Sequence, residues 1–184
     1  MYTYPLLMIP KLENKYLRLE QTRNRLLDEL EALTDEQLNT AAPGGKWSLN
    51  QHVAHLIMVD EVTLNSIQYK LKQPGTLKPA GFSQALKALL LKVALLSGRK
   101  YKAPAPVADV PDHSDLQDLR HNWNNARFAL EDTLTALNPD QIDKCLFKHP
   151  RVGPLNVLQT LAFLQDHFDH HQKIMQQQIR DLVY

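Results

Sequence analysis

The sequence predicts an all-α protein, a four-helix bundle whose helices run up, down, down and up. Four long segments repeat apolar residues at the 3.6-residue period of a helix. The 184-residue chain has only 6 glycines, and aliphatic side chains make up most of its 43% of hydrophobic residues, a composition that favours helices over sheets. Residues 73–113 form a long connection between the second and third segments. Such a crossover suits two consecutive helices that run in the same direction.

The first half of the chain predicts two long helices with a short turn between them. The first helix is expected over about residues 12–33. Thr34 and Gln37 then have the spacing of a capping box, which predicts a short additional turn. Ser48 is a suitable N-cap for the second helix, which is expected to run towards Lys72 before Pro74 and the following glycine stop it.

The second half predicts two further long helices. The third is expected to begin after Ser114 as its N-cap and to extend to about Leu137. The fourth is expected to begin near Pro154, which suits a first-turn position, and to continue almost to Tyr184.

The crossover contains an apolar segment, residues 82–96, which predicts an extra helix packed on the bundle. Two further interpretations of this segment are a dimer surface and a lid over a site. The basic residues 98–102 that follow are interpreted as a solvated loop.

The two halves resemble each other, which predicts pseudo-two-fold symmetry. Residues 33–38 correspond to residues 137–142, and residues 48–50 correspond to residues 154–156. Each half is a long helix, a short turn, a loop and a second long helix. We therefore expect a single domain over residues 1–184.

Composition excludes several classes of protein. A formal net charge of +1 is too small for a nucleic-acid-binding or membrane-surface protein. No run of about 18 apolar residues is present, so no transmembrane helix is expected. Cys145 is the only cysteine, so neither an intramolecular disulfide nor a cysteine-based zinc site can form. Residues 1–10 lack the basic start of a signal peptide, and we expect a cytoplasmic protein.

The strongest candidate site is a pair of histidines in the fourth helix. His167 and His171 are four residues apart and therefore lie on one face of the helix, where both imidazoles can reach one metal ion. The apolar residues of this helix place both beside the core-facing stripe, whereas His170 is expected to face water. A histidine pair of this kind is, by itself, more often a pair of boundary residues, so a third ligand from another helix is needed.

The second helix offers that third ligand, and periodicity leaves the choice between His52 and His55 open. His55 lies in an apolar row, where a lone histidine bonded to a backbone carbonyl is the simpler interpretation. Asp60 and Glu61 are turned away from His55. The remaining candidates rate lower, since they are expected in loops or on solvated faces: His113, His121, His149, Asp166 and Asp169.

Two stretches resemble the DinB-like (damage-inducible) superfamily of four-helix bundles. Residues 47–56 are similar to its Trp-Ser entry to the second helix, with a histidine followed by leucine. Residues 149–155 and the His-x-x-x-His spacing of residues 167–171 are similar to its closing helix. The resemblance covers nearly the whole chain. It implies that His55, rather than His52, joins His167 and His171 as metal ligands.

The resemblance also implies a function. Three histidine ligands suit zinc, nickel or iron(II). The family implies a metal-dependent hydrolase, or a transferase that uses a low-molecular-weight thiol with a small-molecule substrate, and it implies a homodimer. The alternative from another class is a non-catalytic stress-response or binding bundle whose metal is structural or vestigial.

Overall fold

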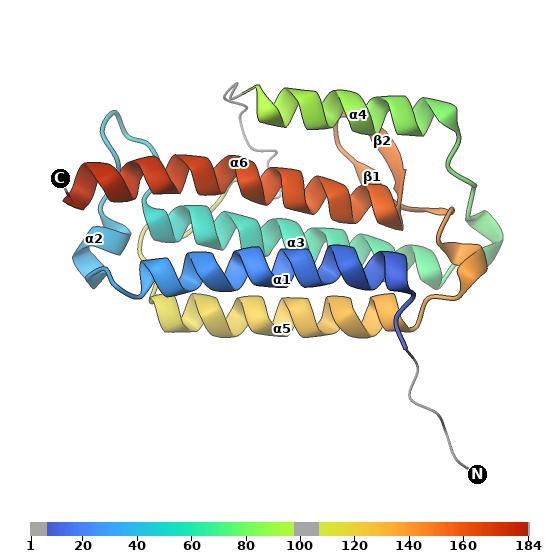
Figure 1. The fold of residues 1–184 in the computed structure, drawn as a ribbon, viewed down its shortest axis with the longest axis horizontal. Helices are drawn as coiled ribbons and strands as arrows, with labels where there is room; N and C mark the ends of the chain where they lie inside the picture. The colour runs from blue at the N-terminus through green and yellow to red at the C-terminus, as the bar shows by residue number, and fades with distance from the viewer. Residues whose placement is uncertain (1–6, 98–106, 184) are drawn as a thin grey trace, which may run out of the picture.

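A computed structural model of the chain describes residues 7–97 and 107–183. Four long helices lie side by side and form a bundle (Figure 1). The helices are α1 (Pro10–Leu30), α3 (Leu49–Leu71), α5 (Leu116–Thr135) and α6 (Val157–Val183). In Figure 1, α1 and α6 run in one direction and α3 and α5 in the other. The predicted all-α, up-down-down-up bundle is therefore confirmed.

The crossover contains the predicted extra helix, α4 (Phe82–Leu96), which packs against α6 on the outside of the bundle. It runs opposite to α3 and α5, so it returns the chain from the end of α3 to the start of α5 (Figure 1). Leu91 and Leu95 are its buried side chains, and Lys92 forms an ion pair with Asp166 of α6 at 3.8 Å. The basic residues 98–102 lie outside the described part of the chain.

Capping boxes confirm the resemblance between the two halves. The Thr34 hydroxyl accepts a hydrogen bond from the backbone N–H of Gln37, and the Gln37 side chain accepts one from the backbone N–H of Thr34. This capping box starts the short helix α2 (Asp35–Asn39). At the corresponding place in the second half, the Gln141 side chain accepts a hydrogen bond from the backbone N–H of Asn138 at the start of the 3-10 turn η3 (Pro139–Gln141), which is half of such a box. Each pair satisfies backbone N–H groups that a helix start leaves free.

Ser48 caps α3 as predicted, through Gln51, but the predicted starts of α5 and α6 were wrong. The cap of α5 is Asp115 rather than Ser114, because its carboxylate accepts hydrogen bonds from two backbone N–H groups of the first turn. Asn156 caps α6 through reciprocal bonds with Gln159. Asn156 is therefore the structural counterpart of Ser48, and Pro154 lies before the helix.

Pro154 lies in a β-hairpin that the sequence analysis did not predict. Strands β1 (Cys145–His149) and β2 (Gly153–Asn156) pair antiparallel, and Gly153 has a positive φ of 80° next to the connecting turn. Strands this short are stabilised by their partners and by burial rather than by intrinsic propensity, so they leave little signal in one sequence.

The interior of the bundle consists of two apolar clusters separated by a buried polar layer. Residues early in α1 and α6 and late in α3 and α5 form the first cluster, and the opposite ends form the second. Between the clusters, the Asp60 carboxylate accepts hydrogen bonds from Trp123 Nε1 at 2.7 Å and Arg127 Nε at 2.9 Å. The Arg23 guanidinium donates to the Trp123 carbonyl in the same layer.

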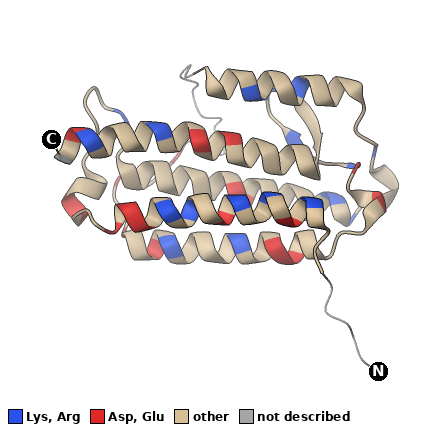
Figure 2. Ribbon diagram, viewed as in Figure 1, with Lys and Arg blue, Asp and Glu red and all other residues tan. Residues whose placement is uncertain are grey.

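The outer surface carries both signs of charge. Figure 2 shows lysine and arginine interspersed with aspartate and glutamate along the helices. None of the helices in the described residues is long and apolar enough to cross a bilayer.

Candidate metal centre

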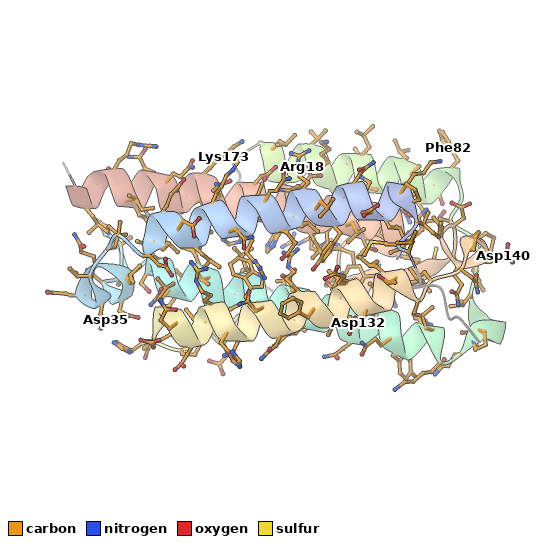
Figure 3. All side chains as sticks on the ribbon, turned by 60° about the horizontal axis from the view of Figure 1, so that its bottom comes forward. Arg18, Asp35, Phe82, Asp132, Asp140 and Lys173 are labelled. Atoms are coloured by element: carbon orange, nitrogen blue, oxygen red, sulfur yellow. The ribbon has the colours of Figure 1, made fainter. Side chains whose placement is uncertain are left out.

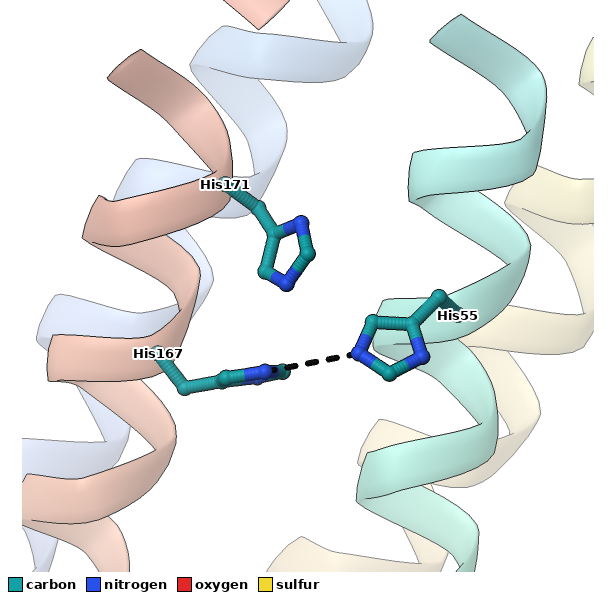
Figure 4. Close-up of side chains that lie close together, drawn as sticks. All are labelled: His55, His167 and His171. Carbon is teal, nitrogen blue, oxygen red and sulfur yellow. Dashed lines mark hydrogen bonds between the residues drawn. The ribbon is translucent and has the colours of Figure 1, made fainter. Parts of the chain in front are cut away.

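The structure brings together the three histidines that the sequence singled out. His55 of α3 faces His167 and His171 of α6, and one ring nitrogen from each lies within 4.8 Å of those from the other two. Figure 4 shows the three imidazoles directed towards one another across the gap between the helices. His55 and His171 are buried, and His167 is partly exposed.

Two of the three side chains come from one helix face. His167 and His171 are one turn apart on α6, and their ring centroids are 4.7 Å apart. The ring of His55 completes a triangle, with centroids 5.2 Å from His167 and 4.9 Å from His171. Because α3 and α6 pack against each other, the two-residue motif of α6 becomes a three-residue cluster.

A backbone carbonyl fixes the orientation of His55. Its Nδ1 donates a hydrogen bond to the Val107 carbonyl oxygen at 2.7 Å. The proton of the neutral ring therefore lies on Nδ1, and the lone pair of Nε2 points towards His167. A carbonyl partner on the far nitrogen is the usual arrangement of a metal-ligating histidine.

The geometry fits a divalent metal ion. Nitrogen ligands lie about 2.0–2.1 Å from zinc, so two of them in a tetrahedral site are about 3.3–3.4 Å apart. The Nε2 atoms of His55 and His167 are 3.4 Å apart. Three neutral imidazoles are also a donor set that zinc, nickel and iron(II) accept.

Electrostatics keep these imidazoles neutral at neutral pH. Burial lowers the pKa of His167 to about 3, and His55 and His170 act in the same direction. Burial also lowers the pKa of His55, although its bond to Val107 opposes the shift, and it lowers the pKa of His171 well below 6.5. Since these pKa values lie below 6.5, protons compete for the ring nitrogens only at acidic pH.

Trp47 forms one wall of the cluster. Its indole ring is 4.9 Å from the His55 ring, and it stacks on His171 with an interplanar angle of 21° at 6.3 Å. The sequence pointed to Trp47 only through the family resemblance. It lies directly before Ser48, the N-cap of α3.

His52 also lies beside the cluster. Helical periodicity left open whether His52 or His55 is the third ligand. It is buried, and its Nδ1 lies 2.9 Å from Nδ1 of His171. His52 therefore contacts a member of the cluster on the side that faces away from His55 and His167. The helical periodicity of α3 did not reveal this role, because residues 52 and 55 lie only about 60° apart around a helix.

Two other histidines differ from the sequence expectations. His149 is buried at the end of β1, where its Nδ1 accepts backbone hydrogen bonds from Arg151 and Val152, and it is not a loop residue. His170 was expected to face water. Instead it is partly buried beneath α4 and donates from Nδ1 to the Leu95 carbonyl oxygen.

The remaining candidates lie elsewhere, as predicted. His121 is exposed, and Asp60 is turned away from His55 towards Trp123 and Arg127. Asp166 and Asp169 pair instead with Lys92 and Arg18. Over residues 7–97 and 107–183, no carboxylate joins the three-histidine group.

One comparison with known proteins identifies the family of the chain. The sequence profile of the DinB superfamily matches residues 18–175 of the chain, a span that includes all three histidines of the cluster. Comparisons with curated proteins and with solved structures gave no match.

Proposed function

The chain belongs to the DinB superfamily, and from this membership and the histidine cluster we propose that it is a metal-dependent enzyme. One divalent ion, zinc, nickel or iron(II), binds to His55, His167 and His171. The observation that supports this most directly is the convergence of three buried or partly buried ring nitrogens within 4.8 Å.

The number of protein ligands supports catalysis. Catalytic zinc sites have three protein ligands and one open position, whereas structural sites have four. When bound, the ion lowers the pKa of a coordinated water towards 7 and deprotonates a coordinated thiol outright. We therefore propose a hydrolase or a transferase that uses a low-molecular-weight thiol with a small-molecule substrate.

The side chains around the cluster have separate tasks in this proposal. The Val107 carbonyl holds the His55 ring in one orientation. The indole of Trp47, stacked on His171, excludes water from one side of the site. His167 is the partly exposed member of the cluster, and we propose that a small substrate enters beside it.

A non-catalytic protein with a structural metal is the second candidate function. It is favoured by the lack of a carboxylate beside the three histidines in the described residues, because metal-dependent hydrolases commonly use one as a general base.

Elemental analysis and a substrate panel test the proposal together. Protein purified without a histidine tag is expected to carry, or to take up on titration, about one equivalent of metal. Hydrolysis of ester and amide substrates and conjugation of low-molecular-weight thiols are then measured on chelator-treated and metal-reloaded protein. The enzyme proposal expects activity only after reloading. A rise in melting temperature without activity supports the non-catalytic protein, and less than about 0.1 equivalent of metal with no rebinding contradicts both candidates.

We also propose that two copies associate through the outer face of α4. Its large apolar side chains are between 48% and 85% exposed and follow one helical stripe: Phe82, Leu86, Leu89, Leu90, Val93 and Leu96. Phe82, labelled in Figure 3, projects outward from α4. A contiguous exposed apolar stripe is typical of a protein–protein interface. Because a second copy presents the same stripe, the two faces can pair around a two-fold axis.

Light scattering tests this association. The wild-type protein is expected to have the mass of a dimer, and a Leu89→Glu/Val93→Glu variant that of a monomer. Both side chains are more than half exposed, so the variant is expected to keep the helical circular dichroism of the wild type. A wild-type monomer would exclude the dimer.

We also propose that the protein is cytoplasmic and binds neither nucleic acid nor membranes. Its charge distribution and its cysteine content support this proposal. Along the helices of the described residues, positive and negative residues are interspersed (Figure 2). Cys145 is a free cysteine, as is usual in a reducing compartment.

A further inference from the structure

A cavity of about 400 Å³ lies along α6, outside the histidine cluster. Helices α4 and α1 both pack against α6, and Figure 1 shows α6 between them. Residues of all three helices and of β2 line the cavity. Small-molecule sites have volumes of about 300–1,000 Å³, are mostly apolar and carry a few polar groups. We propose that this cavity binds a small monocarboxylic acid with an apolar body, such as a medium-chain fatty acid.

Most of the cavity wall is apolar. It includes side chains from α4, β2 and α6: Ala88, Leu91, Leu155, Leu158, Ala162 and Phe163. Leu91, Leu155 and Phe163 are buried, so they form a floor rather than an exposed surface. The apolar body of a ligand is stabilised on this floor because its surface is removed from water.

The charges of the wall do not balance. Among the described residues that line the cavity, the charged side chains are Lys15, Lys92 and Asp166. Lys92 pairs with Asp166 at 3.8 Å, whereas Lys15 forms no ion pair in the described part of the chain. Burial raises the pKa of Asp166, and both lysines oppose the rise, so Lys15 lies close enough to act on the same carboxyl group. One positive charge is therefore left over at the edge of an apolar cavity.

This combination selects the class of ligand. An apolar body fits the floor, and a single carboxylate pairs with the ammonium group of Lys15 by a charge-assisted hydrogen bond. A cationic molecule of the same shape would add a third positive charge beside Lys15 and Lys92. An uncharged one would leave Lys15 without its partner. The site should therefore prefer the anion over both.

The cavity is close to the histidine cluster but does not depend on it. Phe163 lines the cavity, and its ring centroid is 5.6 Å from that of His167. The described residues of the wall include none of the three clustered histidines. Binding of the acid is therefore expected both in chelator-treated and in zinc-loaded protein.

Calorimetric titration of the wild-type protein with three eight-carbon probes tests the preference. The probes are octanoate, 1-octanol and octyltrimethylammonium, which share a chain and differ in charge. We expect about one equivalent of octanoate to bind per chain. Its dissociation constant should be at least about tenfold lower than that of the cation, with 1-octanol between them.

Two variants separate the head group from the chain. Lys15→Glu replaces an attraction by a repulsion, so it should weaken octanoate binding by about tenfold and leave 1-octanol within about twofold. Lys46→Glu makes the same change of charge at an exposed loop residue and should bind octanoate like the wild type. Ala162→Phe fills the cavity and should weaken both probes by more than about tenfold.

Nuclear Overhauser effects between octanoate and the wild-type protein locate the ligand without any variant. We expect them at the ring protons of Phe163 and the methyl groups of Leu155. They should be absent from Phe82, which is 85% exposed on α4. This measurement decides the proposal even if Ala162→Phe does not fold.

Three results would overturn the proposal. The first is no binding of octanoate to the wild type at up to about 1 mM. The second is an equal loss of octanoate and 1-octanol binding in Lys15→Glu, since the carboxylate would then not lie at Lys15. The third is contact of octanoate with Phe82 instead of Phe163, which would place it on the outer face of α4. A protein that binds octanoate but no zinc would contradict only the proposed metal site.

Discussion

Replacing His167 with alanine is expected to weaken zinc binding by more than about 100-fold. His167 offers one of three converging nitrogens, and its Nε2 lies 3.4 Å from that of His55, the separation expected for two ligands of one ion. Loss of an outer hydrogen-bond partner already costs about 10–100-fold in metal affinity, so the loss of a ligand should cost more. Chelator competition measures the dissociation constant of each protein.

Thermal unfolding gives an independent measurement of the same change. A ligand that binds only the folded state stabilises it by about 4 kcal/mol when present at about 1,000 times its dissociation constant. Zinc should therefore raise the melting temperature of the wild type and of His121→Ala, whose side chain is exposed. At the same zinc concentration it should stabilise His167→Ala by less than about 1.5 kcal/mol, and so raise its melting temperature much less. A His167→Ala variant with wild-type affinity would show that the cluster is not the metal site.

Replacing Asp60 with alanine is expected to lower the free energy of unfolding by about 3–5 kcal/mol. The Asp60 carboxylate accepts from both Arg127 and Trp123 in the polar layer of the core. The Arg127 side chain is only 2% exposed, so the variant leaves a buried charge and a buried indole N–H without their acceptor. The Glu20 carboxylate, 3.7 Å from Arg127, compensates in part. Urea unfolding monitored by circular dichroism measures the change.

An exposed ion pair provides the control for this prediction. The Asp28 side chain is 70% exposed and lies 3.3 Å from Arg120, so Asp28→Ala should cost no more than about 1 kcal/mol. Asp60→Asn keeps an acceptor of the same shape and should fall between the two alanine variants. Equal losses for Asp60→Ala and Asp28→Ala would show that the polar layer does not stabilise the bundle.

Much of the fold could be predicted from the sequence because it depends on local physics. The 3.6-residue periodicity indicated four long helices and the extra helix of the crossover, and the long connection indicated their directions. The capping boxes at Thr34 and Ser48 require only residues three positions apart. The same short-range geometry paired His167 with His171.

Features that depend on distant neighbours could not be predicted in this way. The hairpin that contains Pro154 forms because β1 supplies a partner strand, so the helix expected at Pro154 starts only after Asn156. His170 was expected to face water, but α4, far away in the sequence, covers it. His149 is buried by the hairpin and by the ring of Phe163, 4.7 Å away.

The histidine cluster illustrates both what the sequence alone determines and what only the tertiary structure decides. The sequence determined that one face of α6 carries two imidazoles, since residues four apart on a helix must lie together. It could not distinguish His52 from His55 by periodicity, and the family resemblance made that choice. Only the tertiary structure shows why the two differ. The Val107 carbonyl, 52 residues from His55, turns the free nitrogen of His55 towards His167, whereas His52 meets the far side of His171. Ring orientation depends on contacts between elements, and helical periodicity carries no information about them.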